Sequence, residues 1–309
     1  MNALLYGLGR ALLAVIQALP LTLVARLGRL GGAVAYLVDA RHRRVALENL
    51  RRVFGDTLDP AARRRLAREN FRRIGENFAC GVKTAFLSDD ALSACLEVGG
   101  QEHLGPASPG SAGPGCVVAI GHFGNFELYA RCGRYWPGYR YATTYRALRQ
   151  PALNRLFQTL RARSGCLFFE RRSEAGALRA ALSQSRLMLG LLVDQHAGDH
   201  GLRVPFFGAD CSTSTAPALL ALRYQCALHV GICYRTRLAH WRIELGPAIP
   251  TRQNGHARPL ADIAGDINRA FEAAIRRDPA NWFWVHRRWK PAPRAKPAAP
   301  IAAAPPPAA

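Results

Sequence analysis

The sequence predicts an α/β fold in which a mainly parallel central sheet is flanked by helices, with an N-terminal membrane-associating helical segment in front of it. Two observations carry this prediction. From residue 116 onward, short apolar runs typical of buried strands alternate with helical segments, and this order is typical of parallel sheets. Residues 41–95 have a helical pattern throughout, and an apolar stretch precedes them.

The alternation places each element of the sheet. Strands are expected at 116–120, 140–145, 166–169, 188–193, 227–234 and 240–245. Helices are expected at 125–135, 151–163, 173–185, 214–225 and 259–277. Functional sites in such sheets lie beyond the carboxyl ends of the strands, so residues that directly follow a strand are the first candidates for a function.

Residues 1–40 are expected to form a membrane anchor. Residues 11–25 carry no charge, and a second apolar stretch follows at 30–38. The first run is 15 residues long and contains Pro20, whereas a spanning helix needs about 20 apolar residues. An interfacial or shallowly inserted helix is therefore favoured over a spanning one. A cleaved signal peptide and a pair of core helices are the alternatives.

The rest of the chain divides into two parts. Residues 41–290 are expected to form the main domain, with 41–95 as a helical lead-in. Residues 291–309 are rich in proline and alanine, and this tail is expected to be disordered. The eight cysteines include no C-x-x-C pair, which indicates reduced thiols and a body that faces the cytosol.

The charge of the chain indicates anionic partners. Lys and Arg number 42 against 21 Asp and Glu, the net charge is +21, and only three of the basic residues are lysine. Arginine binds phosphate and carboxylate in a bidentate manner. Many arginines lie between residues 41 and 73, next to the apolar segment, as in proteins that bind an anionic cytoplasmic leaflet. GC-rich coding is the alternative explanation for part of this excess.

The segment after the 116–120 strand carries the first candidate site. It reads Gly121-His122-Phe123-Gly124-Asn125-Phe126-Glu127. A histidine in this position can act as a general base, and a nearby carboxylate can orient it and stabilise the imidazolium. The chain has no G-x-S-x-G elbow. We therefore expect His122 to deprotonate a bound hydroxyl, which attacks an activated acyl group, while backbone N–H groups of the Gly124-Asn125 turn stabilise the oxyanion. A buried core histidine is the alternative.

Four further segments follow in a fixed order. They are Thr144-Tyr145-Arg146, the run Gly165–Arg171, Asp194-Gln195 with Val204-Pro205-Phe206-Phe207-Gly208, and the run Asn281–Lys290. With the His122–Glu127 segment, they make the chain resemble the bacterial lipid A biosynthesis (lauroyl/myristoyl) acyltransferases, within the H-x4-D/E glycerolipid acyltransferase superfamily. The resemblance extends to about residue 290. Asp194-Gln195 stands where many phospholipid acyltransferases carry Pro-Glu-Gly, which favours the lipid A branch.

The resemblance implies a reaction and its partners. An acyl chain would pass from acyl carrier protein, or less often coenzyme A, to a hydroxyl of a lipid A precursor at the cytoplasmic face of the inner membrane. His122 would be the general base and Glu127 would orient it. Arg171, with Arg146 as a second candidate, would contact acceptor phosphate, and Asp194 and Gln195 would line the substrate site.

Neither a cofactor nor a metal is expected, and nucleic acid is not an expected partner. The alternative enzyme is an acyltransferase acting on a lysophospholipid, a phosphoinositol mannoside or an ornithine-type lipid. A non-enzymatic protein that binds membranes or nucleic acid through its basic surface would explain the charge, but it would leave His122 and Glu127 without a role.

Overall fold

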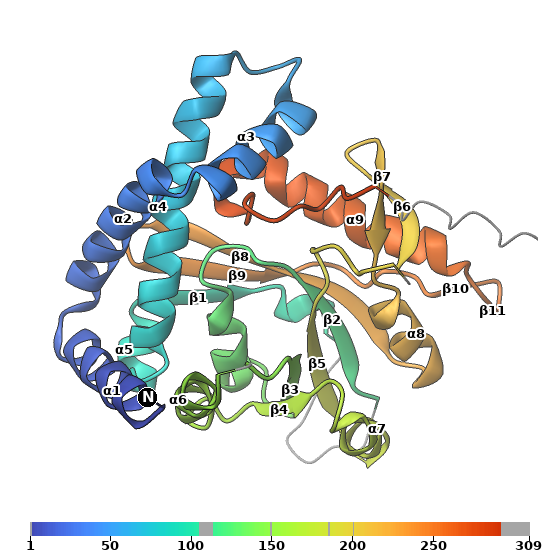
Figure 1. Ribbon diagram of the computed structural model, residues 1–309. Coiled ribbons are helices and arrows are strands. Elements are labelled where there is room, and N and C mark those ends of the chain that lie inside the picture. The colour runs from blue at the N-terminus through green and yellow to red at the C-terminus, as the bar shows by residue number, and fades with distance from the viewer. Residues whose placement is uncertain (1, 105–113, 149, 185, 200, 292–309) are drawn as a thin grey trace, which may run out of the picture.

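The computed structural model describes residues 2–104, 114–148, 150–184, 186–199 and 201–291. The expected disordered tail lies outside the described residues from 292 onward. A seven-stranded sheet forms the centre of the fold (Figure 1). Its strands, in spatial order, are β1 (Leu96–Gly99), β9 (His240–Leu245), β8 (Ala227–Arg237), β2 (Cys116–Ile120), β5 (Leu187–Leu192), β3 (Arg140–Tyr145) and β4 (Leu167–Glu170).

Within this seven-stranded sheet, all neighbouring strands are parallel except β8 and β9. The mainly parallel sheet flanked by helices is therefore confirmed. Strand β2 is fully buried, and its side chains alternate between the two faces. Val117 and Ala119 pack into one core, while Val118 and Ile120 pack into the other. Successive side chains of a strand point to opposite faces of the sheet, so a strand with apolar residues at every position is buried on both faces.

Helices cover both faces of the sheet. The first core includes side chains from α3 (Ala40–Phe54), α8 (Ala216–Arg223) and α9 (Leu260–Arg277). The second core includes side chains from α5 (Asp89–Ser93) and the 3-10 helix η2 (Phe126–Tyr135). The long helix α4 (Pro60–Thr84) contributes to both cores, Phe71 to one and Cys80 to the other. Helices α6 (Pro151–Arg161) and α7 (Ala175–Gln184) complete the fold near β3 and β4 (Figure 1).

Some elements differ from the prediction. The expected helix at 125–135 is a 3-10 helix, and β1 was not predicted. An unpredicted hairpin is formed by β6 (Leu202–Phe206) and β7 (Ala209–Thr213), although β6 contains a proline. Proline is tolerated there because this two-stranded sheet leaves one side of the strand without a partner. Smaller elements are β10 (Arg252–Gln253), β11 (His256–Ala257), η1 (Gln101–His103) and η3 (Pro279–Asn281).

The N-terminal helices α1 (Asn2–Ala18) and α2 (Leu21–Val38) lie along one flank, where α2 runs beside α4 (Figure 1). The two helices approach closely because glycines meet at the contact. A Cβ on Gly32 would collide with the carbonyl of Phe71, and one on Gly28 would lie 2.5 Å from the carbonyl oxygen of Gly75. By length and composition alone, α2 could cross a membrane. Its glycine face nevertheless packs on α4, and Arg29 forms ion pairs with Glu69 and Glu76 of α4.

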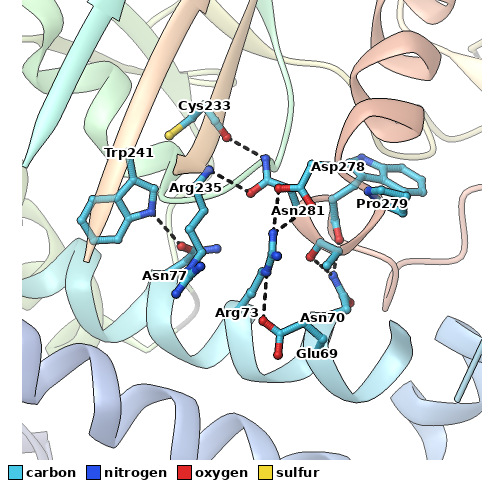
Figure 2. A network of polar contacts seen from close by, with 12 residues as sticks. Glu69, Asn70, Arg73, Asn77, Cys233, Arg235, Trp241, Asp278, Pro279 and Asn281 are labelled. Atoms are coloured by element: carbon cyan, nitrogen blue, oxygen red, sulfur yellow. Dashed lines mark hydrogen bonds and ion pairs between the residues drawn. The ribbon is translucent and has the colours of Figure 1, made fainter. Parts of the chain in front are cut away.

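A polar network ties α4 to the sheet and to the segment that follows α9 (Figure 2). Arg73 Nη1 lies 2.7 Å from Asp278 Oδ2, and Trp241 Nε1 donates to Asn77 Oδ1 at 3.1 Å. Asn281 Nδ2 donates to the carbonyl oxygen of Cys233 at 2.9 Å. The network fixes the backbone just before residues 282 and 283, which reach the ends of the central strands.

Candidate active site

The candidate site lies at the carboxyl ends of β2 and β5. These strands are parallel neighbours in which Ile120 pairs with Leu192, so His122 and Asp194 each lie two residues beyond a paired strand end. The register brings their side chains together. His122 Nδ1 lies 2.7 Å from Asp194 Oδ1, and the backbone N–H of His122 donates to Asp194 Oδ2 at 2.9 Å.

Asp194 is a buried carboxylate, and both of its oxygens interact with residues of this site. Its exposed fraction is 1%, and Trp282 Nε1 also donates to Oδ2, at 2.8 Å. Burial alone would raise the pKa of Asp194, but the interactions with His122 and Trp282 hold it below its ordinary value. The ionised carboxylate favours the tautomer of His122 with the proton on Nδ1, which leaves Nε2 as an acceptor.

The ring of His122 is held between two phenylalanines. Its centroid lies 4.8 Å from that of Phe126 and 5.7 Å from that of Phe283. The side chain is 18% exposed, and within the described part of the chain Nε2 has no hydrogen-bond partner. A hydroxyl could therefore approach Nε2 while Nδ1 stays bound to Asp194, which is the arrangement that a general base requires.

Glu127 is placed differently from Asp194. It is half-buried, and among the described residues its carboxylate makes no hydrogen bond to His122 or to any other group. Burial raises the pKa of Glu127, while the charges of Arg161 and His122 act in the opposite direction. Among the described residues the contact with Nδ1 of His122 is made by Asp194, and the predicted role of Glu127 in orienting His122 stays a prediction.

The turn before Glu127 supplies fewer free N–H groups than expected. Gly124 N donates to the carbonyl oxygen of Asn281 at 3.1 Å, so it is not available to an oxyanion. The residue has a φ of 51°, and a Cβ there would lie 2.6 Å from the carbonyl oxygen of Cys233. Glycine is therefore required by both the backbone conformation and the space.

Arg146 and Arg171 lie at the same edge of the sheet. They follow β3 and β4, whose last residues Tyr145 and Glu170 are paired, and both are exposed. Counted from β2, these strands are two and three positions away, which puts the backbones at roughly 10 and 15 Å from that of His122. Both arginines thus lie at the edge of the sheet that carries His122, on strands that are not adjacent to β2.

Gln195 directly follows Asp194 and is half-buried, and its side chain forms no hydrogen bond within the described ranges. The described residues also contain no group of three His, Cys, Asp or Glu side chains that could hold a metal ion.

An apolar cavity lies beneath the site, with about 780 Å³ of empty space including its opening to solvent. Phe126 and Glu127 line it together with side chains from β2, β3, β5 and η2. Trp136, Tyr141 and Ile243 are also among its walls. Its surface is mostly carbon, and Glu127 and Arg161 are the only charged side chains among the described residues that line it.

Three contributors to the site were not assigned a role from the sequence. Trp282 and Phe283 come from the terminal run Asn281–Lys290, which was used above only as a family motif. Arg161 had no motif around it. In the same terminal segment, His286 Nε2 accepts the backbone N–H of His196 at 3.0 Å, and burial lowers the pKa of His286 to about 4. His286 is therefore neutral near pH 7.

Comparison with known proteins gives a consistent match. The model of the family described as "Bacterial lipid A biosynthesis acyltransferase" matches residues 2–291. The chain is 26% identical over 304 residues to a lipid A biosynthesis lauroyltransferase of Escherichia coli (strain K12), covering 94% of this chain and 92% of that protein. It is 27% identical over 300 residues to a lipid A biosynthesis palmitoleoyltransferase of the same organism, covering 93% and 91%. A lipid A biosynthesis acyltransferase of Shigella flexneri matches to the same extent.

Proposed function

The chain belongs to the family of bacterial lipid A biosynthesis acyltransferases, and on that premise we propose that it moves a fatty acyl chain from the thioester of acyl carrier protein to a hydroxyl group of a lipid A precursor. That the protein is an acyltransferase follows from the family. The donor, the acceptor hydroxyl, the roles of single residues and the membrane association are our proposals.

The observation that carries the proposal is the pairing of His122 with Asp194. Nε2 of His122 takes the proton of the acceptor hydroxyl while the hydroxyl oxygen forms a bond with the thioester carbonyl carbon. The tetrahedral intermediate then expels the donor thiolate, which receives the proton from His122. The ester and the free thiol are the products. Proton transfer of this kind contributes about 10²–10⁴-fold to the rate.

Two carboxylates serve His122 in this mechanism. Asp194 Oδ1 accepts the hydrogen bond from Nδ1–H of His122, with a distance of 2.7 Å between the oxygen and the nitrogen, and stabilises the imidazolium that forms. We assign Asp194 a positioning role instead of contact with substrate, because both of its oxygens are occupied and it is buried. Glu127 stabilises the same positive charge through space, from the wall of the apolar cavity.

The remaining site residues divide between the two substrates. The apolar cavity suits the acyl chain, since burial of each methylene group stabilises the complex by about 0.8 kcal/mol. We propose that Arg146 and Arg171, which are exposed at the ends of β3 and β4, bind anionic groups of the acceptor. Gln195 is placed to donate or accept a hydrogen bond next to Asp194.

Membrane association is proposed on the exposed face of the N-terminal helices. On α2 the exposed apolar residues recur every three or four positions, at Leu23, Leu27, Leu30, Val34 and Leu37. This spacing forms a stripe on one side of a helix. The opposite side packs on α4. The helix therefore presents an apolar stripe outward, as an interfacial helix does when it lies in the plane of a membrane.

The test uses the purified full-length protein with an acyl-carrier-protein thioester and two acceptors, an underacylated lipid A precursor and a lysophospholipid. Mass spectrometry of the products reports which acceptor gains an acyl chain, and His122→Ala is the control. Acylation of the lipid A precursor that depends on His122 supports the proposal. Acylation of the lysophospholipid alone would contradict the acceptor, and transfer to neither would contradict the reaction.

A further inference from the structure

Arg161 lies in the wall between two cavities. The first is the apolar cavity described above, and the second, with about 830 Å³ of empty space including its opening to solvent, is lined mainly by residues of α4, η2 and α6. Only four of the described residues line both: Glu127, Ala130, Arg161 and Phe168. One acidic side chain, Glu127, and one basic side chain, Arg161, thus line both of these largely apolar cavities.

The guanidinium of Arg161 is held by aromatic rings. Its central carbon lies 4.7 Å from the ring centroid of Tyr145, 5.2 Å from that of Phe168 and 5.9 Å from that of Phe157. Stacking of this type fixes the position of a cation without neutralising it. Among the described residues, the side chain has no hydrogen-bond acceptor, and its Nε atom is buried without a partner.

A buried donor without an acceptor is unfavourable, so this charge needs a compensating group. Glu127 is the only described acidic side chain that lines either cavity. The other arginine of the second cavity, Arg131, is already committed, because it donates to the carbonyl oxygens of Thr84, Ala85 and Leu87. Arg161 is therefore the cation available to Glu127.

We propose that Arg161 is a positioning residue that keeps Glu127 ionised beside His122, so that the imidazolium formed during transfer lies between two negative carboxylates. The inference rests on the proposed function and deepens it, because it assigns a role to a residue outside every sequence motif. Glu127 is half-buried in an apolar wall, where the neutral acid would otherwise be favoured. Arg161 opposes that preference, because it is a fixed cation that forms no ion pair with another carboxylate of the described residues.

Among the described residues, the other titratable groups that line the two cavities are Arg161 from α6, Arg131, Tyr129 and Cys132 from η2, Tyr141 and Tyr145 from β3, and Cys166 before β4. His122 lines neither cavity, but its charge also acts on Glu127. Burial raises the pKa of Cys132, Cys166, Tyr129 and Tyr141, so these groups are neutral near pH 7. Burial has the largest effect on the pKa of Glu127 and raises it, and the charges that oppose this effect are those of Arg161 and His122.

The test is the pH dependence of kcat/KM for acyl transfer, which reports ionisations of the free enzyme. Removal of Arg161 should raise the pKa of Glu127, so the acid limb of Arg161→Gln should move to higher pH by about one unit. In Arg161→Lys, which keeps the positive charge, the acid limb should lie at the same pH as in the wild type. Arg155→Gln, which removes an exposed arginine from the same helix, should leave the limb unchanged.

A double-mutant cycle makes the test specific. In a Glu127→Gln background, Arg161→Gln should produce no further shift of the acid limb, because the group that Arg161 controls is absent. An equal shift in that background would overturn the proposal. So would an unchanged limb with a raised KM for the donor, since Arg161 would then bind substrate.

A second readout does not require activity. A carboxyl group whose pKa is raised by folding contributes stability below its unfolded pKa, and that stability is lost as pH rises through the folded pKa. The loss of stability with rising pH should be larger in Arg161→Gln than in the wild type. This extra loss should be absent from the double variant that also carries Glu127→Gln. Thermal unfolding between pH 4 and 8 measures it. Equal pH dependence in both backgrounds would overturn the pairing, whereas an inactive but correctly pH-dependent protein would overturn only the proposed function.

Discussion

Asp194 Oδ1 lies 2.7 Å from His122 Nδ1, although the two residues are 72 positions apart in the chain. The contact exists because β2 and β5 are adjacent parallel strands in register, and each residue lies two positions beyond its strand. Trp282, from the far end of the chain, donates to the same carboxylate. Three distant segments thus combine to fix one imidazole ring, and this relationship supports the assignment of His122 as the base.

The pairing predicts how stability depends on pH. The pKa of Asp194 is lowered by folding, so its contribution to stability is present above its ordinary value of 3.8 and is lost as pH falls through the lower, folded value. The difference in unfolding free energy between the wild type and Asp194→Asn should therefore be largest near neutral pH and shrink below about pH 4. Urea unfolding at several pH values measures it. A difference that does not change with pH would contradict an ionised Asp194.

Glu76 anchors α4 to α2 and the sheet. Its side chain is fully buried, and it accepts from Arg235 Nε at 2.9 Å, Arg29 Nη1 at 3.2 Å and the backbone N–H of Ala239 at 2.9 Å. Glu76→Ala would leave the half-buried Arg235 guanidinium and the backbone N–H of Ala239 without this acceptor, while Arg29 keeps its ion pair with Glu69, so we expect a loss of about 3–5 kcal/mol in unfolding free energy. Glu69→Ala, in the same helix but partly exposed, should cost about 1 kcal/mol or less. Equal losses would contradict this account of Glu76.

The contact of α2 with α4 predicts opposite results for two adjacent glycines. A Cβ at Gly32 would strike the backbone of Phe71, whereas a Cβ at Gly31 would meet nothing within 4 Å. Gly32→Ala should lower the melting temperature because the helices must separate. Gly31→Ala should raise stability by up to about 1 kcal/mol through helix propensity. Thermal unfolding compares the two, and destabilisation by both would mean that α2 has another contact on its outer side.

The outer stripe of α2 predicts membrane binding. Leu30→Ser with Val34→Ser removes two exposed apolar side chains of the stripe, and we expect affinity for anionic vesicles to fall by about tenfold or more. Leu202→Ser with Leu219→Ser removes exposed apolar side chains elsewhere and is the control. Co-sedimentation with vesicles measures both. If the control pair has the larger effect, the membrane surface lies on another part of the fold.

Much of the sheet could be predicted because local patterns determine it. The strands at 116–120, 140–145 and 240–245 have the predicted limits, since buried strands are short apolar or alternating runs with turn residues at their ends. The four-residue strand β1 and the β6–β7 hairpin were missed, the first because it is too short for a pattern and the second because Pro205 argues against a strand.

The candidate site was predictable only in part. His122 and Asp194 each follow an apolar strand, and that position is visible in the sequence. Their contact depends on strand order and register, which no local pattern contains. Glu127 was predicted to orient His122, and that role stays a prediction, whereas the contact with Nδ1 is made by Asp194, a residue that is near in space but distant in sequence. Arg161 could not be found at all, because its significance depends on two cavities that α4, α6 and the sheet form together.

The most direct test of the account is the turnover of His122→Ala, Asp194→Asn and the double variant with an acyl-carrier-protein donor and an underacylated lipid A precursor. Residues that act as one unit are not additive, so we expect each single variant to lose about 10²-fold or more in kcat, and the double variant to be no slower than His122→Ala. Circular dichroism controls for folding. Full activity of His122→Ala, or losses that multiply in the double variant, would contradict a base held by Asp194.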